Sequence, residues 1–192
     1  MDGVQQEQWE RWLTRQSTGR PQARFARLQP PVTSNVRRHK HPVGDIVIHA
    51  LQFLATLSTC LFAGAAVYIN LVEHPARMGC ETKTAATVWA PSYKRATVMQ
   101  ASLAIVGLLA GVAVWLLGGG AMWLVGALFI GAVVPFTFIA IMPTNHQLLE
   151  PDRDLSSNET RGLLEKWGKL HGVRSVLSLV ASVIYVALLR GA

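Results

Sequence analysis

Four long apolar stretches constrain this sequence more than any other feature. They cover approximately residues 46–71, 96–117, 121–142 and 173–189. A helix needs about 20 mainly apolar residues to cross a hydrocarbon core about 30 Å thick, so each stretch is long enough. Lipid offers no hydrogen-bond partners to the backbone, so each stretch must satisfy its own N–H and C=O groups as a helix. The sequence therefore predicts an all-α, multi-pass integral membrane protein whose default packing is a four-helix bundle.

Composition and loop lengths agree with this prediction. Only 15% of the residues are charged, against 51% hydrophobic, and most charges fall in the first 45 residues and in two loops. The short link 118–120 is all glycine and predicts an antiparallel hairpin of the second and third spans. Gly107 and Gly111, like Ser178 and Ser182, have the spacing that lets neighbouring helices approach closely.

Residues 1–45 form a basic leader with eight Lys and Arg against four Asp and Glu, and residues 46–192 form the membrane domain. Trp9, Trp12 and Leu13 would share one face of a short helix, which is typical of an interfacial anchor. Pro21, Pro30 and Pro31 follow, so the leader is expected to be mostly disordered. The net charge of +7 favours anionic lipid surfaces, and no motif indicates nucleic-acid binding.

Patterns typical of cofactor sites were not found. No CxxC, Cys-His cluster or Gly-rich phosphate loop appears, so neither a metal nor another cofactor is predicted. Cys60 and Cys80 are 20 residues apart, about 30 Å along a helix, which argues against a disulfide. A haem held by His49 with either His171 or His146 is disfavoured, because His49 lies near the opposite membrane boundary from both.

Polar residues gather in the two loops that an even number of spans places on one side of the membrane. The first loop includes residues 70–77 and 89–95, and the second includes 142–146 and 167–174. Trp167, His171 and Arg174 are spaced i, i+4 and i+7, so they share one helical face at the membrane boundary. His171 is the first candidate base, since imidazole exchanges protons near neutral pH. Glu73 is expected to pair with Arg77 or Arg174.

These segments resemble a known family, the DUF1772 or anthrone oxygenase family of small four-span membrane proteins. The resemblance runs from about residue 50 onward and leaves the leader outside. Its motifs lie at 68–77, 89–96, 135–136 with 142–145, and 167–174. The resemblance implies an oxygenase that converts an anthrone to an anthraquinone with molecular oxygen, without an evident metal or flavin.

We infer roles for the loop residues from the chemistry that this resemblance implies. The base would be His171 or Glu73, and Arg174 with Asn145 would hold the developing oxyanion. The other candidate substrate-binding residues are Trp167, Asn70 and His74. Glu73 or Asn145 is accordingly expected within hydrogen-bonding reach of His171 or Arg174.

A second interpretation, from a different class, stays open on the sequence alone. In it the chain is a structural or accessory membrane subunit, and the same polar residues only tie the two loops together. For the protein as a whole, the expected partners are the lipid bilayer, a hydrophobic aromatic small molecule, and another copy of the chain or a membrane-complex subunit. The sequence does not fix which membrane holds the chain.

Overall fold

The computed structural model describes residues 3–18 and 42–191, and the chain divides into the units Met1–His39 and Lys40–Ala192. In the first unit, α1 spans Gly3–Thr18. Trp9 and Trp12 stack with ring centroids 5.2 Å apart and are exposed together with Leu13, as expected for a helix with one aromatic face. The rest of the predicted leader, including Pro21, Pro30 and Pro31, lies outside the described residues.

The second unit is built from four long helices, and no strand occurs among the residues described. Each helix is long and apolar enough to cross a membrane: Val43–Met78, Thr82–Leu116, Ala121–Leu148 and Asn158–Leu189. The first consists of α2 (Pro42–Tyr68), a π-helical segment η1 (Ile69–Glu73) and α3 (His74–Met78). The second is α4 (Thr82–Leu116), and the fourth is α7 (Asn158–Leu189). The third consists of α5 (Ala121–Phe136), η2 (Thr137–Ile141) and α6 (Met142–Leu148). The protein is thus a multi-pass integral membrane protein.

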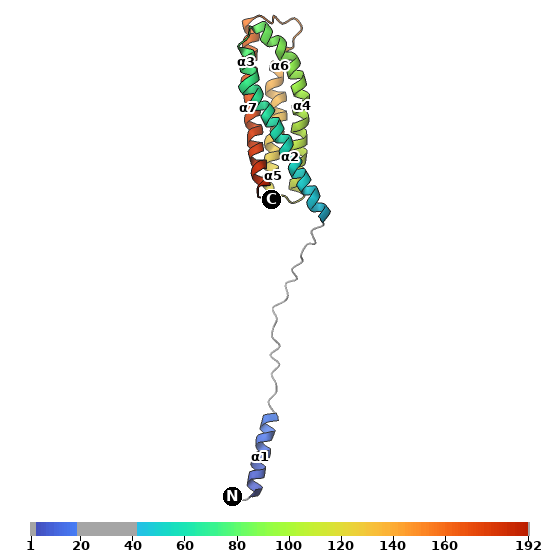
Figure 1. Ribbon diagram of the computed structural model, residues 1–192, viewed down its shortest axis with the longest axis vertical. Helices are drawn as coiled ribbons and strands as arrows, with labels where there is room; N and C mark the ends of the chain where they lie inside the picture. Colours follow the sequence, from blue (N-terminus) through green and yellow to red (C-terminus); the bar gives the residue numbers. More distant parts are fainter. Residues whose placement is uncertain (1–2, 19–41, 192) are drawn as a thin grey trace. The chain divides into compact units, whose positions relative to one another are not determined.

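The four helices form a bundle in which α2 and α5 each pack against both α4 and α7 (Figure 1). Small residues allow this close approach. A Cβ atom on Gly107 would lie 2.6 Å from Oγ1 of Thr59, and the ring of Tyr185 occupies the space beside Gly111 and Gly126. The hydroxyl of Ser182 donates to the carbonyl of Thr59 across the bundle at 3.2 Å. The predicted close packing at Gly107, Gly111 and Ser182 is therefore present.

The bundle carries apolar side chains on its outside and many polar ones inside. Outward-facing residues such as Phe53, Leu109 and Val183 are more than half exposed, as suits a surface in contact with lipid. The interior contains buried polar side chains from α2, α4 and α7: Gln52, Thr56, Ser58, Thr59, Gln100, Ser175, Ser178 and Ser182. Many hydroxyls bond backbone carbonyls of their own helix, as Thr56 does to Gln52 at 2.8 Å.

Two of the long helices share an unusual local structure. In each, a five-residue π segment directly precedes a short helix that has proline as its second residue, Pro75 in α3 and Pro143 in α6. Proline lacks an N–H and clashes with the carbonyl four residues earlier. A π turn accommodates both by widening the helix, and such turns are frequent at functional sites. These two long helices therefore continue beyond the apolar stretches 46–71 and 121–142, to Met78 and Leu148.

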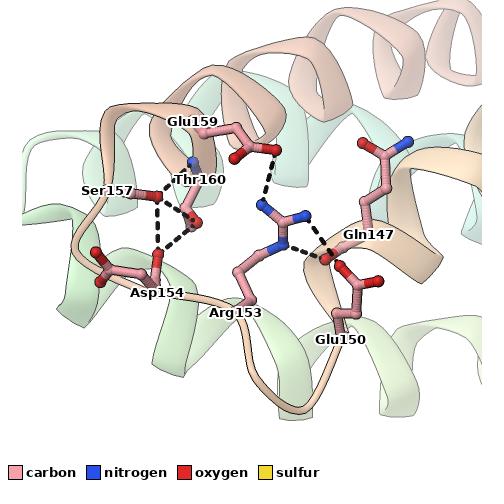
Figure 2. Close-up of polar contacts among 7 residues, drawn as sticks. All are labelled: Gln147, Glu150, Arg153, Asp154, Ser157, Glu159 and Thr160. Carbon is pink, nitrogen blue, oxygen red and sulfur yellow. Dashed lines mark hydrogen bonds and ion pairs between the residues drawn. The ribbon is translucent and has the colours of Figure 1, made fainter.

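The link between α6 and α7 is held by polar contacts that set the start of α7 (Figure 2). Arg153 forms ion pairs of 3.2 Å with both Glu150 and Glu159. The side chain of Ser157 caps α7 by accepting from the backbone N–H of Thr160 at 3.2 Å. These contacts fix the first turns of α7, which lead to the functional candidates farther along the same helix.

The α3–α4 and α6–α7 links lie at one end of the bundle, while α2 begins and α7 ends at the other (Figure 1). Exposed Cys80 in the first link offers a test of topology once Cys60 is replaced by Ala. We expect a membrane-impermeant maleimide to reach Cys80 from one side only. Ser156→Cys, in a Cys80→Ser background, should label from that same side, and Gly191→Cys from the opposite side. Labelling of Cys80 and Gly191→Cys from the same side would contradict the four-span arrangement.

Candidate functional site

A small polar cavity lies near the end of the bundle that holds both π segments. Its volume is about 20 Å³, room for about one water molecule. Residues from η1, α3, α4 and α7 line it, including Glu73, Arg77, Trp89, Ser92, Tyr93, Gln100, Trp167, His171 and Arg174. Four predicted site residues, Glu73, Trp167, His171 and Arg174, thus meet at one cavity.

The orientation of His171 is fixed by Asn70 in η1. The amide oxygen Oδ1 of Asn70 lies 2.6 Å from Nδ1 of His171 and accepts from the hydroxyl of Ser175 at 2.8 Å. The amide nitrogen Nδ2 of Asn70 donates to the carbonyl of Gly168 at 2.9 Å. The carbonyl of Gly168 can only accept, so the Asn70 atom that contacts it must be the amide nitrogen. The other amide atom, which faces His171, is therefore the oxygen.

Asn70 thereby sets the tautomer of neutral His171. An amide oxygen only accepts, so Nδ1 of His171 must carry the hydrogen in this contact. In the neutral ring the other nitrogen, Nε2, then holds the free lone pair. No described residue forms a hydrogen bond with Nε2. The arrangement leaves Nε2 as the nitrogen that can accept a proton.

Arg174 lies one turn further along α7 and is more than nine-tenths buried. Its Nη2 donates to the amide oxygen of Gln100 in α4 at 2.7 Å, and its guanidinium lies 5.4 Å from the ring centre of Phe62. Among the described residues, no carboxylate lies within ion-pair distance of it. A buried cation held only by a neutral amide and an aromatic ring can interact with an anion that enters the site.

Glu73 is already engaged, in contrast to Arg174. Its Oε1 forms an ion pair with Arg77 one turn later and accepts from the hydroxyl of Ser92 at 2.7 Å. The pair with Arg77 is one of the two that the sequence predicted. It ties the end of the first long helix to α4 and leaves Glu73 less available as a base than His171.

The side chains that line the cavity carry more buried donors than the protein supplies with acceptors. Five N–H groups have no hydrogen-bond partner among the described residues: Nε of Arg77 and Arg174, Nε1 of Trp89 and Trp167, and Nε2 of Gln100. A buried polar group without a partner costs about 1–3 kcal/mol, so native structures rarely keep several together without reason. A set made only of donors is suited to a ligand that is rich in oxygen acceptors.

Aromatic rings support this polar group on one side. His171 stacks on Trp167 with centroids 4.9 Å apart, and Trp167 meets Trp89 edge to face at 5.8 Å. Trp89 in turn stacks on Tyr93 in α4 at 5.0 Å, with planes within 4°. These contacts restrict the imidazole to one plane, which would favour a defined direction of proton transfer.

Three predicted site residues, Asn70, His74 and Asn145, are not among those that line the polar cavity. Asn145 in α6 is fully buried, its amide atoms have no partner among the described residues, and it lines none of the described cavities. His74 packs against Gly168 and against Trp167 at 5.3 Å, and it borders a separate open cavity that Asn70 also lines. Within the described part of the chain, no group of three or more His, Cys, Asp or Glu is placed to hold a metal ion.

The contacts between the two loops differ from the expected ones. No hydrogen bond joins Glu73 or Asn145 to His171 or Arg174 in the described ranges; His171 meets Asn70 instead. The reason is local, because Glu73 finds its cation four residues away on its own helix. Asn70, nearly one turn earlier, faces α7 and takes the role that was expected of Glu73.

Sequence reasoning missed the contribution of α4. Gln100, which binds Arg174, was not among the predicted site residues, and Tyr93, which lines the cavity, lay in the predicted first loop without an assigned role. Trp89, Tyr93, Thr97 and Gln100 recur at intervals of three and four, so they share one face of α4. That stripe of aromatic and polar residues entering an apolar span was the available signal.

Comparisons with known proteins find a family and a relative that this chain resembles. A family model described as anthrone oxygenase matches residues 89–184, half of the chain. The protein named anthrone oxygenase tpcL from Aspergillus fumigatus is 38% identical over 56 residues, which are 28% of this chain and 35% of that protein. The match thus spans about a third of that relative. No solved structure matches the chain. The matched range contains Gln100, His171 and Arg174, while Asn70 and Glu73 precede it.

The network around Asn70 predicts a specific tautomer. In nitrogen-15 NMR spectra of histidine-labelled protein in lipid nanodiscs, neutral His171 should be protonated at Nδ1 and bare at Nε2. Asn70→Leu should remove this preference and lower the free energy of unfolding by about 1–3 kcal/mol, because it leaves buried partners unpaired. His171→Gln assigns the signal, and exposed His146 serves as the reference. A wild-type His171 protonated at Nε2 would contradict the predicted geometry.

Proposed function

This chain belongs to the anthrone oxygenase family, and from that premise we propose that it oxidises an anthrone-like aromatic ketone to a quinone with molecular oxygen. The proposal rests on one observation above all. The polar cavity combines a nitrogen base, Nε2 of His171, with several buried N–H donors that have no acceptor. Proton removal followed by oxyanion stabilisation needs these two kinds of group.

The substrate chemistry explains why these groups can suffice. An anthrone has a methylene group between two aromatic rings, opposite a ketone, and loss of one methylene proton gives an anion delocalised onto the ketone oxygen. That anion transfers electrons to oxygen, and a carbon–oxygen bond forms at the former methylene carbon. The oxygen–oxygen bond then breaks as the second hydrogen leaves that carbon. One oxygen atom ends in the new carbonyl group, and the other leaves as water.

His171 is assigned the role of base. Asn70 holds its Nδ1–H, so Nε2 is free to take the methylene proton. Stacking on Trp167 limits rotation of the imidazole ring, so the ring is already oriented for proton transfer when the substrate binds. The protonated ring can return this proton when water forms. Glu73, the other candidate base, instead holds Arg77 and Ser92.

Arg174 is assigned to the anion. Its guanidinium lacks a carboxylate partner in the described part of the chain, and its Nε lacks an acceptor. Gln100, rather than the predicted Asn145, stands beside it and offers a second unmatched donor. Donors that are already in place when charge develops on oxygen need no reorganisation, and the surrounding low-dielectric interior strengthens their effect.

The rival function, a structural or accessory subunit, also has an observation in its favour. Arg161 in α7 donates to the backbone carbonyls of Met78 and Cys80, which ties the α3–α4 link to α7. A cluster that serves only as such a tie would be expected to match its donors with acceptors. The five unmatched N–H groups therefore favour a site for a ligand.

Replacement of His171 separates the two functions. In the oxygenase, His171→Ala should lower kcat for anthrone oxidation at least about 100-fold, the scale of losing a positioned general base, while the purified protein stays folded. In a structural subunit, it should mainly lower thermal stability, by about 1–3 kcal/mol. Thermal unfolding in detergent and oxygen uptake in nanodiscs measure these two effects.

The control is His146→Ala, because His146 is exposed on α6 and lines no described cavity. Its rate should equal that of the wild type. The wild type must also exceed spontaneous oxidation of the same anthrone. If several soluble anthrones show no acceleration, the oxygenase assignment fails for this substrate class, and the accessory function becomes the better explanation.

A further inference from the structure

A second cavity adjoins the polar one and has the opposite character. Its volume is about 90 Å³, and it lies among α2, α4, α5 and η2 with mostly apolar walls. Tyr93, Thr97, Gln100 and Arg174 line both cavities, so the two share a wall. An apolar cavity that meets a donor-rich one at Arg174 is suited to a molecule with an apolar body and one polar edge.

The apolar cavity reaches the lipid-facing surface of the bundle. Ala101 in α4 and Phe138 in η2 both line it, and both are exposed, Phe138 to 63%. Thr137, also in its wall, donates its hydroxyl to the carbonyl of Val133 at 2.7 Å, which leaves its methyl group as the apolar part. The mouth between α4 and η2 therefore opens towards hydrocarbon.

We propose that this mouth is a lateral binding slot through which a planar aromatic ketone enters from the lipid, so that its ketone oxygen binds at the wall shared by the two cavities. The inference rests on the proposed oxidation and adds the position and direction of binding. The ketone oxygen of the ligand lies against Arg174 and Gln100, whose Nε and Nε2 donors lack acceptors. Its outer ring lies between Ala101 and Phe138.

Volume requires the outer ring to stay at the mouth. Even together, the two cavities are smaller than a cavity of about 150 Å³, the size that holds a single benzene molecule. A three-ring ketone therefore projects through the opening into hydrocarbon unless side chains move. It follows that the slot tolerates apolar substituents on the ring that projects through the mouth.

Photolabelling tests the slot independently of oxidation. The probe is 4-hydroxybenzophenone, a diaryl ketone without the methylene group that the reaction needs; its excited carbonyl inserts preferentially at methionine. Met142 lines the apolar cavity, whereas Met99 and Met122 are exposed and do not line it. In nanodiscs of phosphatidylcholine, adducts mapped by mass spectrometry should fall mainly on Met142. Equal labelling of the three residues would show mere partitioning into lipid and would overturn the slot.

Variants at the mouth sharpen the test. Ala101→Phe should block the opening and lower Met142 labelling by about tenfold. A loss of binding of this size lies within the usual free-energy cost of overpacking a site. Phe138→Ala should widen the opening and preserve or raise the labelling, and it keeps the test decisive if the first variant is unstable. Val183→Phe, on the lipid-facing side of α7, is the matched control and should leave labelling unchanged. Unaltered Met142 labelling in stable Ala101→Phe would overturn the slot.

The outcomes also separate the slot from the proposed reaction. Met142 labelling that Ala101→Phe suppresses, in a protein that oxidises no anthrone, supports the slot and removes the oxidation. Anthrone oxidation that Ala101→Phe leaves unchanged, with no preference for Met142, supports the reaction and removes the slot.

Discussion

Because hydrocarbon offers no hydrogen-bond partners, the polar groups inside this bundle can form hydrogen bonds only with one another. In water an unmatched N–H finds a solvent molecule, whereas in hydrocarbon it must bond within the protein or remain a cost. Asn70 is the clearest answer to this constraint, because its single amide bonds His171, Ser175 and the carbonyl of Gly168. Most hydroxyls deeper in the bundle bond carbonyls of their own helix. Against this background, five of the ten unmatched buried side-chain atoms in the described residues belong to side chains that line one cavity, and all five are donors; the others are on Thr59, His74, Thr144 and Asn145.

The π segments connect an irregular helical backbone to this site. Each long helix with a proline near its end inserts a π turn before it, and η1 carries Asn70 and Glu73. A π turn contains one more residue than an α turn. Without that extra residue, Asn70 and Glu73 would point in other directions about the helix axis and would meet other neighbours. Asn70 meets α7, and Glu73 meets Arg77 of α3 and Ser92 of α4. The second π segment, η2, places Thr137 and Phe138 in the wall of the apolar cavity. Both irregular segments thus supply residues to the two joined cavities.

The sequence predicted the helices better than the contacts between them. Length and hydropathy suffice for four spans, because hydrocarbon permits few alternatives. The face that carries Trp167, His171 and Arg174 followed from helical spacing alone, and these three residues do share the polar cavity. The partners of His171 and Arg174 depend on the rotation of α2 and α4 about their axes, which periodicity in a uniformly apolar helix does not record. Asn145 illustrates the limit: its sequence position suited an oxyanion role, while the structure buries it away from both cavities.

The division between a donor-rich and an apolar cavity has a consequence for reactivity. Arg174 stands on the shared wall, so a ligand whose oxygen meets the guanidinium extends its rings through the apolar cavity towards the lipid. The charge that develops on that oxygen then lies beside a cation that no described carboxylate neutralises, in an interior of low dielectric constant. A carboxylate beside Arg174 would have cancelled this field, and the pairing of Glu73 with Arg77 prevents it. Glu73, which was a candidate base on the sequence alone, therefore contributes to the site by pairing with Arg77. This pairing keeps the negative charge of Glu73 away from Arg174.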